Sequence, residues 1–167
     1  DMIVETRIFP HSKIRNISKG GNTIRRHMFN DGEPKAAAAV HKWTTRHSGQ
    51  IDNFSKGGLT TWIDIPTGIM GGTMEDFSPF ESRRNFDGAA VGSSRRSRFG
   101  GYRYATPNHH ETAEVIEGTK VPYWEDVVDM SKMVMRMVAP GIIYAGIDVM
   151  VTDDGPYVIE LNPWPGG

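Results

Sequence analysis

The chain has 167 residues, which suits one domain of ordinary size or one half of a larger one. Its 19 basic and 20 acidic residues give a formal charge of -1, which argues against a globally basic nucleic-acid-binding protein and against an acidic disordered tail. The absence of cysteine excludes a disulfide framework, a thiolate metal site and a cysteine nucleophile, and it fits a reducing, cytoplasmic compartment. No apolar run approaches the roughly 20 residues of a membrane-spanning helix.

Turn-forming residues divide the first half of the chain into four predicted strands. The third of these contains an alanine run that is also compatible with a helix. The four strands are predicted to span Met2 to Ile8, Thr23 to Phe29, Ala36 to Thr45 and Leu59 to Ile65. The stretch from Phe77 to Tyr102, rich in Gly, Ser and Arg, has little periodicity and is predicted to be a long loop.

The second half contains a predicted helix followed by a hairpin. Apolar residues recur at helical spacing from Trp124 to Val138, and Pro140-Gly141 ends the pattern. From Ile143 to Val151, side chains on one face are all apolar, as in a strand. Asp153-Asp154-Gly155 is predicted to form a three-residue turn, and the return strand is predicted to run from Pro156 to Asn162. The predicted fold class is therefore α+β, with a mostly antiparallel sheet and one long helix packed on it.

The hairpin is predicted to hold two acids side by side. If the turn is centred on Asp154, Asp148 lies opposite Glu160, and Asn162 shares their face. Because paired carboxylates repel, a proton, a basic side chain or a cation must compensate them. Two carboxylates and an amide oxygen are ligands that Mg²⁺ prefers, although the same pattern fits an ordinary solvated sheet face. Neutralising either acid is expected to stabilise the metal-free fold slightly.

The same hairpin resembles a family signature. Gly146-Ile147-Asp148, Glu160-Leu161-Asn162-Pro163 and Pro165-Gly166 resemble the C-terminal signature of ATP-grasp ligases. Further segments resemble the sugar-transfer-associated ATP-grasp group, which is related to α-L-glutamate ligases, and extend the resemblance from Val4 to Gly166. They are Asn22 to Arg25, Asp52 to Gly58, and the stretch from His110 to Trp124. The resemblance implies the ATP-grasp C-terminal lobe, with ATP and Mg²⁺ as cofactors and Asp148, Glu160 and Asn162 as the metal ligands.

The resemblance also implies roles for residues outside the hairpin. By matched position, Arg25 lies beside the phosphates and supplies the donor for the developing oxyanion. Asn53 and Lys56 belong to a loop that ends in Gly57-Gly58, and they are implied to be catalytic beside the phosphates and the acceptor. Arg25, Lys56 and Glu5 are the implied ATP contacts, with Glu5 in the adenine hinge. Arg26 is expected to point to the face opposite Arg25 because side chains alternate along a strand.

The implied activity is that of an ATP- and magnesium-dependent carboxylate–amine ligase, which works through an acyl phosphate. The partners would be a small-molecule carboxylate and an amine, and the family name implies an association with surface polysaccharide or sugar transfer. Residues 1–167 are interpreted as one ATP-grasp C-terminal lobe, a fragment that lacks the N-terminal lobe and its lid. An upstream ATP-grasp lobe is therefore an expected partner, and this chain alone is expected not to turn over.

Two other classes of function remain open. Within the 77–104 loop, the segment from Glu81 to Arg103 carries six arginines against two acids, together with glycines and aromatic residues. We rank a solvated loop first, an electropositive rim for an anionic substrate second and a single-strand nucleic-acid-binding module third. A non-catalytic ATP-grasp-like partner subunit is a further alternative. His109 and His110 are expected to be solvated loop residues, since no other histidine is spaced to complete a zinc site.

Overall fold

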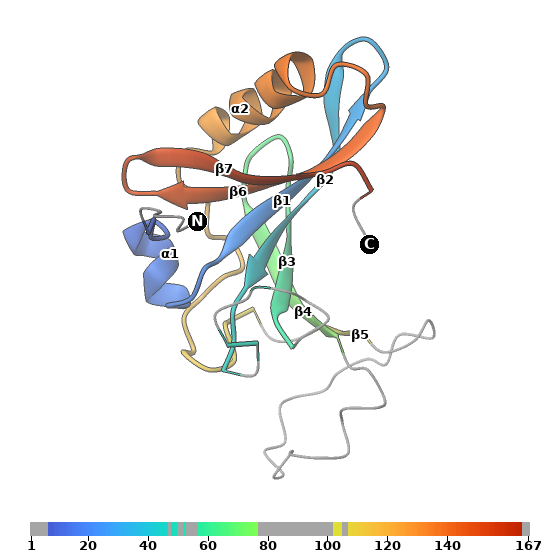
Figure 1. Ribbon diagram of the computed structural model, residues 1–167. Helices are drawn as coiled ribbons and strands as arrows, with labels where there is room; N and C mark the ends of the chain where they lie inside the picture. Colours follow the sequence, from blue (N-terminus) through green and yellow to red (C-terminus); the bar gives the residue numbers. More distant parts are fainter. Residues whose placement is uncertain are drawn as a thin grey trace, which may run out of the picture.

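The computed structural model describes residues 7–46, 48–49, 52, 57–76, 102–104 and 107–164. One antiparallel sheet in the order β5-β4-β3-β2-β1-β6-β7 forms the body of the protein (Figure 1). Its strands are β1 (Thr23–Asn30), β2 (Pro34–Trp43), β3 (Leu59–Ile63), β4 (Met70–Asp76), β5 (Tyr102–Tyr104), β6 (Tyr144–Thr152) and β7 (Gly155–Asn162). The helices are α1 (Ser12–Ile17) and α2 (Trp124–Met137).

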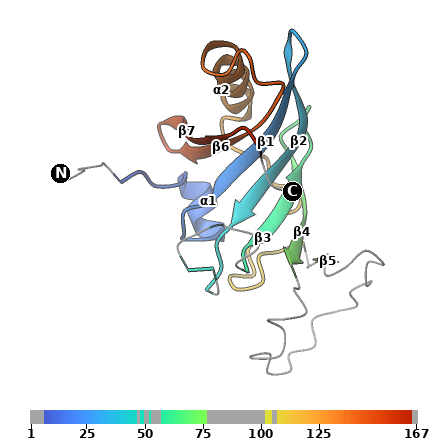
Figure 2. The same cartoon turned by 45° about the vertical axis from the view of Figure 1, so that its right-hand side comes forward.

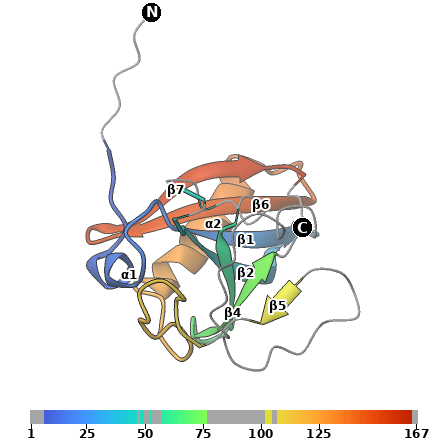
Figure 3. The ribbon, with the colours of Figure 1, turned by 90° about the horizontal axis from the view of Figure 1, so that it is seen from below.

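The chain builds the sheet in two stages. Strands β1 to β5 run as a meander, and α2 then carries the chain back so that β6 pairs with the free edge of β1. Strand β1 is thereby paired on both sides, with β2 and β6, near the middle of the sheet. The two views in Figures 2 and 3 show that α2 lies across one face, so that the other face of β1 and β6 is seen in Figure 3.

The predicted α+β class and antiparallel sheet are confirmed, and the helix content is larger than predicted. Helix α2 has 14 residues and buries a face made by Trp124, Val127, Ser131, Val134 and Met135. Glu125 and Asp126 lie in its first turn and Arg136 in its last, where they complement the helix dipole. Val138, which was predicted to end the helix, follows it and is 72% exposed.

Several elements were absent from the sequence prediction. The short α1 has too few residues to show a period, and it is held against the β6–β7 turn because Asp153 accepts from the Ser12 amide (2.8 Å) and from Arg15 (3.1 Å). Strands β4 and β5 were also missed, and the three residues of β5 lie at the end of the segment predicted to be a loop. Of the strand predicted for Met2 to Ile8, residues 1–6 lie outside the described residues, and residues 7–8 carry no strand.

The hairpin reaches the predicted pairing by a different route. Thr152 pairs with Gly155, so the turn consists of the two residues Asp153 and Asp154 and not of three. That register alone would place Ile159 opposite Asp148. A bulge at Ile159 adds one residue to β7, and Asp148 consequently pairs with Glu160. The predicted opposition is therefore confirmed, while the turn that was expected to produce it is wrong.

The core lies between the sheet and α2, α1 and the segment 107–121, and it includes polar groups. Arg26 is 1% exposed, lies 5.2 Å from the Trp124 ring and donates through Nη1 to the Val127 carbonyl at 3.4 Å. Arg26 thus points to the face opposite Arg25, as predicted, and burial lowers its pKa to about 10. No helix in the described part of the chain has the length and apolar content that crossing a membrane requires.

The histidines of this core are buried and not solvated. His41 is 2% exposed and stacks on Trp43 with ring centroids 3.8 Å apart. His109, which was predicted to be a solvated loop residue, is 1% exposed, and its Nε2 lies 3.2 Å from the Thr44 carbonyl oxygen. The sequence prediction failed because the segment 107–121 packs over Trp43 as part of the core.

Burial of His41 predicts a loss of stability in mild acid. Burial lowers the pKa of His41 to about 3, far below its ordinary value of 6.5. Between these pH values the unfolded chain binds a proton that the folded chain excludes. The free energy of unfolding should therefore fall as pH drops below about 6.5, by up to about 1.4 kcal/mol per pH unit from this group.

Denaturant unfolding measured between pH 7 and pH 4 tests this expectation against the variant His41→Phe, which keeps an aromatic ring on Trp43. The variant should have a shallower dependence on pH than the wild type. Identical slopes would show that His41 titrates in the folded protein much as it does in the unfolded chain.

Candidate active site

A row of side chains crosses the sheet on the face away from α2. Arg25 on β1 pairs with Val40 on one side and with Asp148 on the other, and Asp148 pairs with Glu160. Because directly paired residues share a face, β1, β2, β6 and β7 each place one member of the row on this surface. The register therefore places Arg25 on the sheet face that carries Asp148.

Two cations converge on Asp148. Arg25 donates through Nε to Oδ1 at 2.8 Å and through Nη2 to Oδ2 at 2.7 Å, a bidentate pair. Lys42 of β2 donates through Nζ to the same Oδ2 at 3.0 Å. The side chains of Asp148, Lys42 and Arg25 are 5%, 12% and 21% exposed, so this cluster is shielded from most of the solvent. Basic side chains thus supply the compensation that the paired acids require.

The electrostatics of Asp148 follow from these contacts. Burial raises the pKa of Asp148, but the hydrogen bonds from Arg25 and the charge of Lys42 outweigh that effect, and the net pKa lies below its usual range. The hydrogen bond to Asp148 likewise raises the pKa of Arg25. Both groups are therefore charged at neutral pH, and the two cations and the buried carboxylate hold one another in fixed positions.

Asp52 joins the cluster from the loop after β2. Its Oδ1 lies 3.8 Å from Lys42 Nζ, and its Oδ2 accepts a hydrogen bond from the Thr23 hydroxyl. Burial raises the pKa of Asp52, while Lys42 and Thr23 partly oppose the increase. Asp52 is therefore the carboxylate whose charge the cluster stabilises least, in contrast to Asp148.

Glu160 and Asn162 form the outer end of the site. With its amide oriented by the hydrogen-bond network, Asn162 donates through Nδ2 to Glu160 Oε1 at 3.1 Å and accepts from Arg25 Nη2 at 3.3 Å. In the opposite amide orientation, Asn162 Oδ1 lies beside the exposed Glu160 carboxylate. The amide oxygen and a carboxylate oxygen are then presented together. Such a pair is repulsive without a cation and suitable with one, so the donor chemistry fits a hard divalent ion. Among the described residues, no group of three or more His, Cys, Asp and Glu side chains is placed to hold a metal.

Lys42 and Asp52 were missed as site residues, because only the strand order of the folded sheet brings them to Asp148. Val40 and Lys42 alternate along β2, so they share one face, and the strand order then brings that face beside Arg25. Three other residues chosen from the sequence, Glu5, Asn53 and Lys56, lie outside the described residues. Most of the Arg-rich segment 81–103 does so as well.

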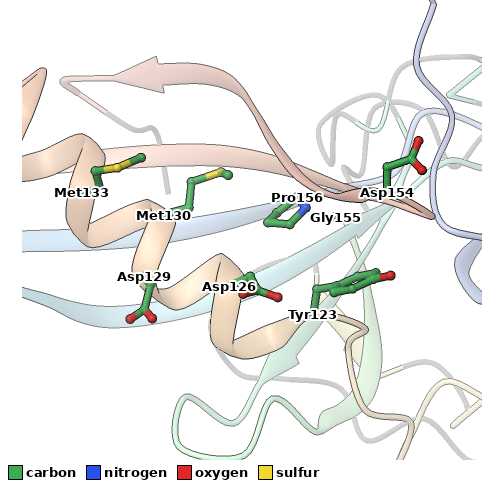
Figure 4. A pocket seen from close by; sticks show the side chains of 8 residues that line it. All are labelled: Tyr123, Asp126, Asp129, Met130, Met133, Asp154, Gly155 and Pro156. Carbon is green, nitrogen blue, oxygen red and sulfur yellow. The ribbon is translucent and has the colours of Figure 1, made fainter.

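A cavity elsewhere in the molecule has different chemistry. It encloses about 620 Å³ beside α2 and the β6–β7 turn (Figure 4). Its lining contains three carboxylates and no basic side chain, which disfavours phosphate, so we place the candidate active site at the ion cluster and not at this cavity. The lining residues are Tyr123, Asp126, Asp129, Met130, Met133, Asp154, Gly155 and Pro156.

Residues 92–166 match the model of the family described as sugar-transfer associated ATP-grasp. The match takes in α2 and the β6–β7 hairpin, and therefore Asp148, Glu160 and Asn162. Arg25, Lys42 and Asp52 lie outside it and join the site through the fold alone. No curated protein and no solved structure matches the chain.

The ion cluster predicts that neutralising Asp148 costs stability and that neutralising Glu160 does not. Removing the charge of Asp148 leaves Arg25 and Lys42 shielded without their partner, so Asp148→Asn should lower the free energy of unfolding by about 2–4 kcal/mol. Glu160 is exposed, and Glu160→Gln should change the free energy of unfolding by less than about 0.5 kcal/mol. The expectation that neutralising either acid stabilises the fold is therefore reversed for Asp148.

Chemical denaturation without added metal measures both values. The two variants remove the same charge from facing positions, so each serves as the control for the other. An equal free energy of unfolding for Asp148→Asn and wild type would mean that the contacts of Arg25 and Lys42 with the Asp148 carboxylate do not stabilise the fold.

Proposed function

We propose that this chain is the ATP- and magnesium-binding catalytic lobe of a carboxylate–amine ligase that works through an acyl phosphate. The matched family is an ATP-grasp family, and ATP-grasp proteins are generally ATP-dependent ligases. The observation that carries the proposal is the convergence of Arg25 and Lys42 on Asp148, directly opposite Glu160. A site that combines adjacent cations with clustered oxygen ligands suits a metal-bound polyphosphate.

Asp148, Glu160 and Asn162 would hold magnesium, which would neutralise and orient the phosphate oxygens when bound. Glu160 and Asn162 are the more accessible ligands, because both oxygens of Asp148 already accept hydrogen bonds from Arg25 or Lys42. In this arrangement Asp148 anchors the cations as well as facing the metal site. Its role therefore differs from that of Glu160, although the two residues are paired.

Arg25 and Lys42 would bind the transferring phosphoryl group. The Nη1 group of Arg25 makes no hydrogen bond within the described part of the chain, so two of its N–H donors remain for a phosphoryl oxygen. Lys42 has three donors, and the ion pairs to Asp148 and Asp52 fix where its charge lies. Donors that are oriented in advance stabilise charge as it develops and need no reorganisation during the reaction.

The described residues on either side of Asn53 and Lys56 are anchored, one to the ion cluster and one to the residues after β2. Asp52, immediately before them, lies 3.8 Å from Lys42, and the Gly57 carbonyl immediately after them accepts from the Thr45 hydroxyl at 2.7 Å. These anchors support the proposal that Asn53 and Lys56 act on the phosphates or the acceptor. Glu5 remains the proposed adenine contact on the basis of the family resemblance alone.

The remaining requirements of the reaction concern its partners. We propose a small-molecule carboxylate and an amine as substrates, and a second ATP-grasp lobe that covers this face and keeps water from the acyl phosphate. The described residues supply one wall of such a site.

The metal assignment predicts a loss of nucleotide binding in Glu160→Gln. Loss of a metal ligand should weaken Mg·ATP binding by more than the roughly tenfold effect of losing an outer-shell partner, while the fold is retained. Calorimetric titration with Mg·ATP, and with ATP in EDTA, gives both affinities. Glu114→Gln removes another exposed carboxylate, one outside the site, and should bind as wild type does. Unchanged Mg·ATP affinity in Glu160→Gln would refute the assignment.

The role of Arg25 predicts a larger effect on turnover than on binding. Negative charge on the phosphoryl oxygens and the oxyanion grows toward the transition state, so Arg25→Ala should lower kcat of the full two-lobe ligase by about 100-fold. Its Mg·ATP affinity should change by less than about tenfold. Arg25→Lys keeps the charge but not the bidentate geometry, and its kcat should lie between the values of wild type and Arg25→Ala. Equal losses in kcat and in affinity would reduce Arg25 to a binding residue.

A further inference from the structure

An exposed tryptophan continues the row of site residues across the sheet. Trp62 on β3 pairs with Val40, which pairs with Arg25, so all three side chains lie on the face away from α2. The Trp62 side chain is 49% exposed, whereas its neighbours Thr61 and Ile63 are buried on the other face. Two interstrand spacings of about 4.8 Å place Trp62 roughly 10 Å from Arg25.

A glycine gives the indole a place against the sheet. A Cβ atom added to Gly71 would lie 1.9 Å from Trp62 Cε2, 2.1 Å from Nε1 and 2.3 Å from Cζ2. These three ring atoms lie nearly equally close to one point of β4, so one face of the ring rests on the Gly71 backbone. A glycine inside a strand often marks such a close approach. The indole is thereby held beside the site while half of it remains open to solvent.

We propose that Trp62 is a stacking platform for the ring of a cyclic sugar acid, the carboxylate-bearing substrate of the proposed ligase. The C–H face of a pyranose would lie on the exposed indole. Its carboxylate would point toward Lys42, which lies diagonally from Trp62 across the β2–β3 ladder. Because the Lys42 ammonium is held at Asp148, the sugar acid itself would span the distance from the indole to that ammonium. The proposal rests on the proposed function and adds a substrate class to it.

A nucleobase suits this position less well than a sugar. A nucleobase carries no anionic group for Lys42, and the nearest side chain across the β2–β3 ladder, Val40, offers no hydrogen bond to the edge of a base. A pyranose requires only the apolar ring face and a partner for its anionic group. Two neighbouring side chains on this face, Val40 and Lys42, supply apolar surface and a cation.

Ligand-observed NMR titration with D-glucuronate tests the platform, and D-gluconate is the matched acyclic acid. Glucuronate should bind at least about tenfold more tightly than gluconate. Trp62→Ala should weaken glucuronate binding by about tenfold, and Trp62→Phe should stay within about threefold of wild type. Gly71→Ala keeps the indole but displaces it, and it should weaken glucuronate binding as well.

Each opposite result overturns the proposal. Equal binding of gluconate would remove the need for a ring, and tighter binding of adenosine than of glucuronate would assign the indole to a base. Unchanged glucuronate affinity in a folded Trp62→Ala variant, checked by circular dichroism, would exclude Trp62 as the platform. Trp164→Phe is the control for the loss of a tryptophan. It changes a 92% exposed tryptophan outside the row and should leave glucuronate affinity unchanged.

Mg·ATP titration of the same samples separates this proposal from the proposed function. If Mg·ATP binds and glucuronate does not, the sugar subsite is wrong and the ligase assignment stands. If glucuronate binds through Trp62 and Mg·ATP does not bind, the ligase assignment is wrong and the subsite stands.

Discussion

The bidentate contact between Arg25 and Asp148, reinforced by Lys42, connects the central strands of the sheet. Asp148 is almost fully buried on β6, a position that an isolated carboxylate would not tolerate. Its partners come from β1 and β2, so the charge requirement of one residue links three strands. The cations that make this burial possible are also the groups placed to meet a phosphate. Stability and the proposed chemistry therefore depend on the same atoms, and neither can be changed without affecting the other.

Neighbouring positions on β1 show how a strand divides charge between two environments. Arg25 faces the open side and is paired with a carboxylate, whereas Arg26 lies against the Trp124 ring on the helix side. Burial lowers the pKa of Arg26 to about 10, and its Nε has no hydrogen-bond partner within the described part of the chain. The fold thus accepts a poorly compensated cation beneath α2 and directs the well-compensated one toward the site.

The sequence identified what depends on local pattern and missed what depends on packing between distant segments. Helical spacing predicted α2 and alternation predicted β6, because these periodicities follow from backbone geometry, while turn-forming residues marked off β1, β2 and β3. Lys42 and Asp52 could not be assigned from spacing, since they meet Asp148 only after β6 has joined β1. His109 looked like a solvated loop residue because nothing local indicates that its segment packs over Trp43. The family resemblance supplied Arg25, whose position on the site face the register then accounts for.

The bulge at Ile159 separates two properties of the hairpin that a regular hairpin would couple. The tight turn at Asp153–Asp154 sets the register near α1, and the extra residue resets it before Glu160. Between the bulge and the end of β7, the cross-strand register therefore differs by one residue from the register that the turn sets. Loss of Ile159 would remove the bulge and would still leave Glu160 opposite Asp148, because that is the pairing that the two-residue turn sets in a regular hairpin. A single-residue deletion at the bulge should therefore preserve the acidic pair, whereas a single-residue insertion between Gly155 and Glu160 would shift Glu160 away from Asp148.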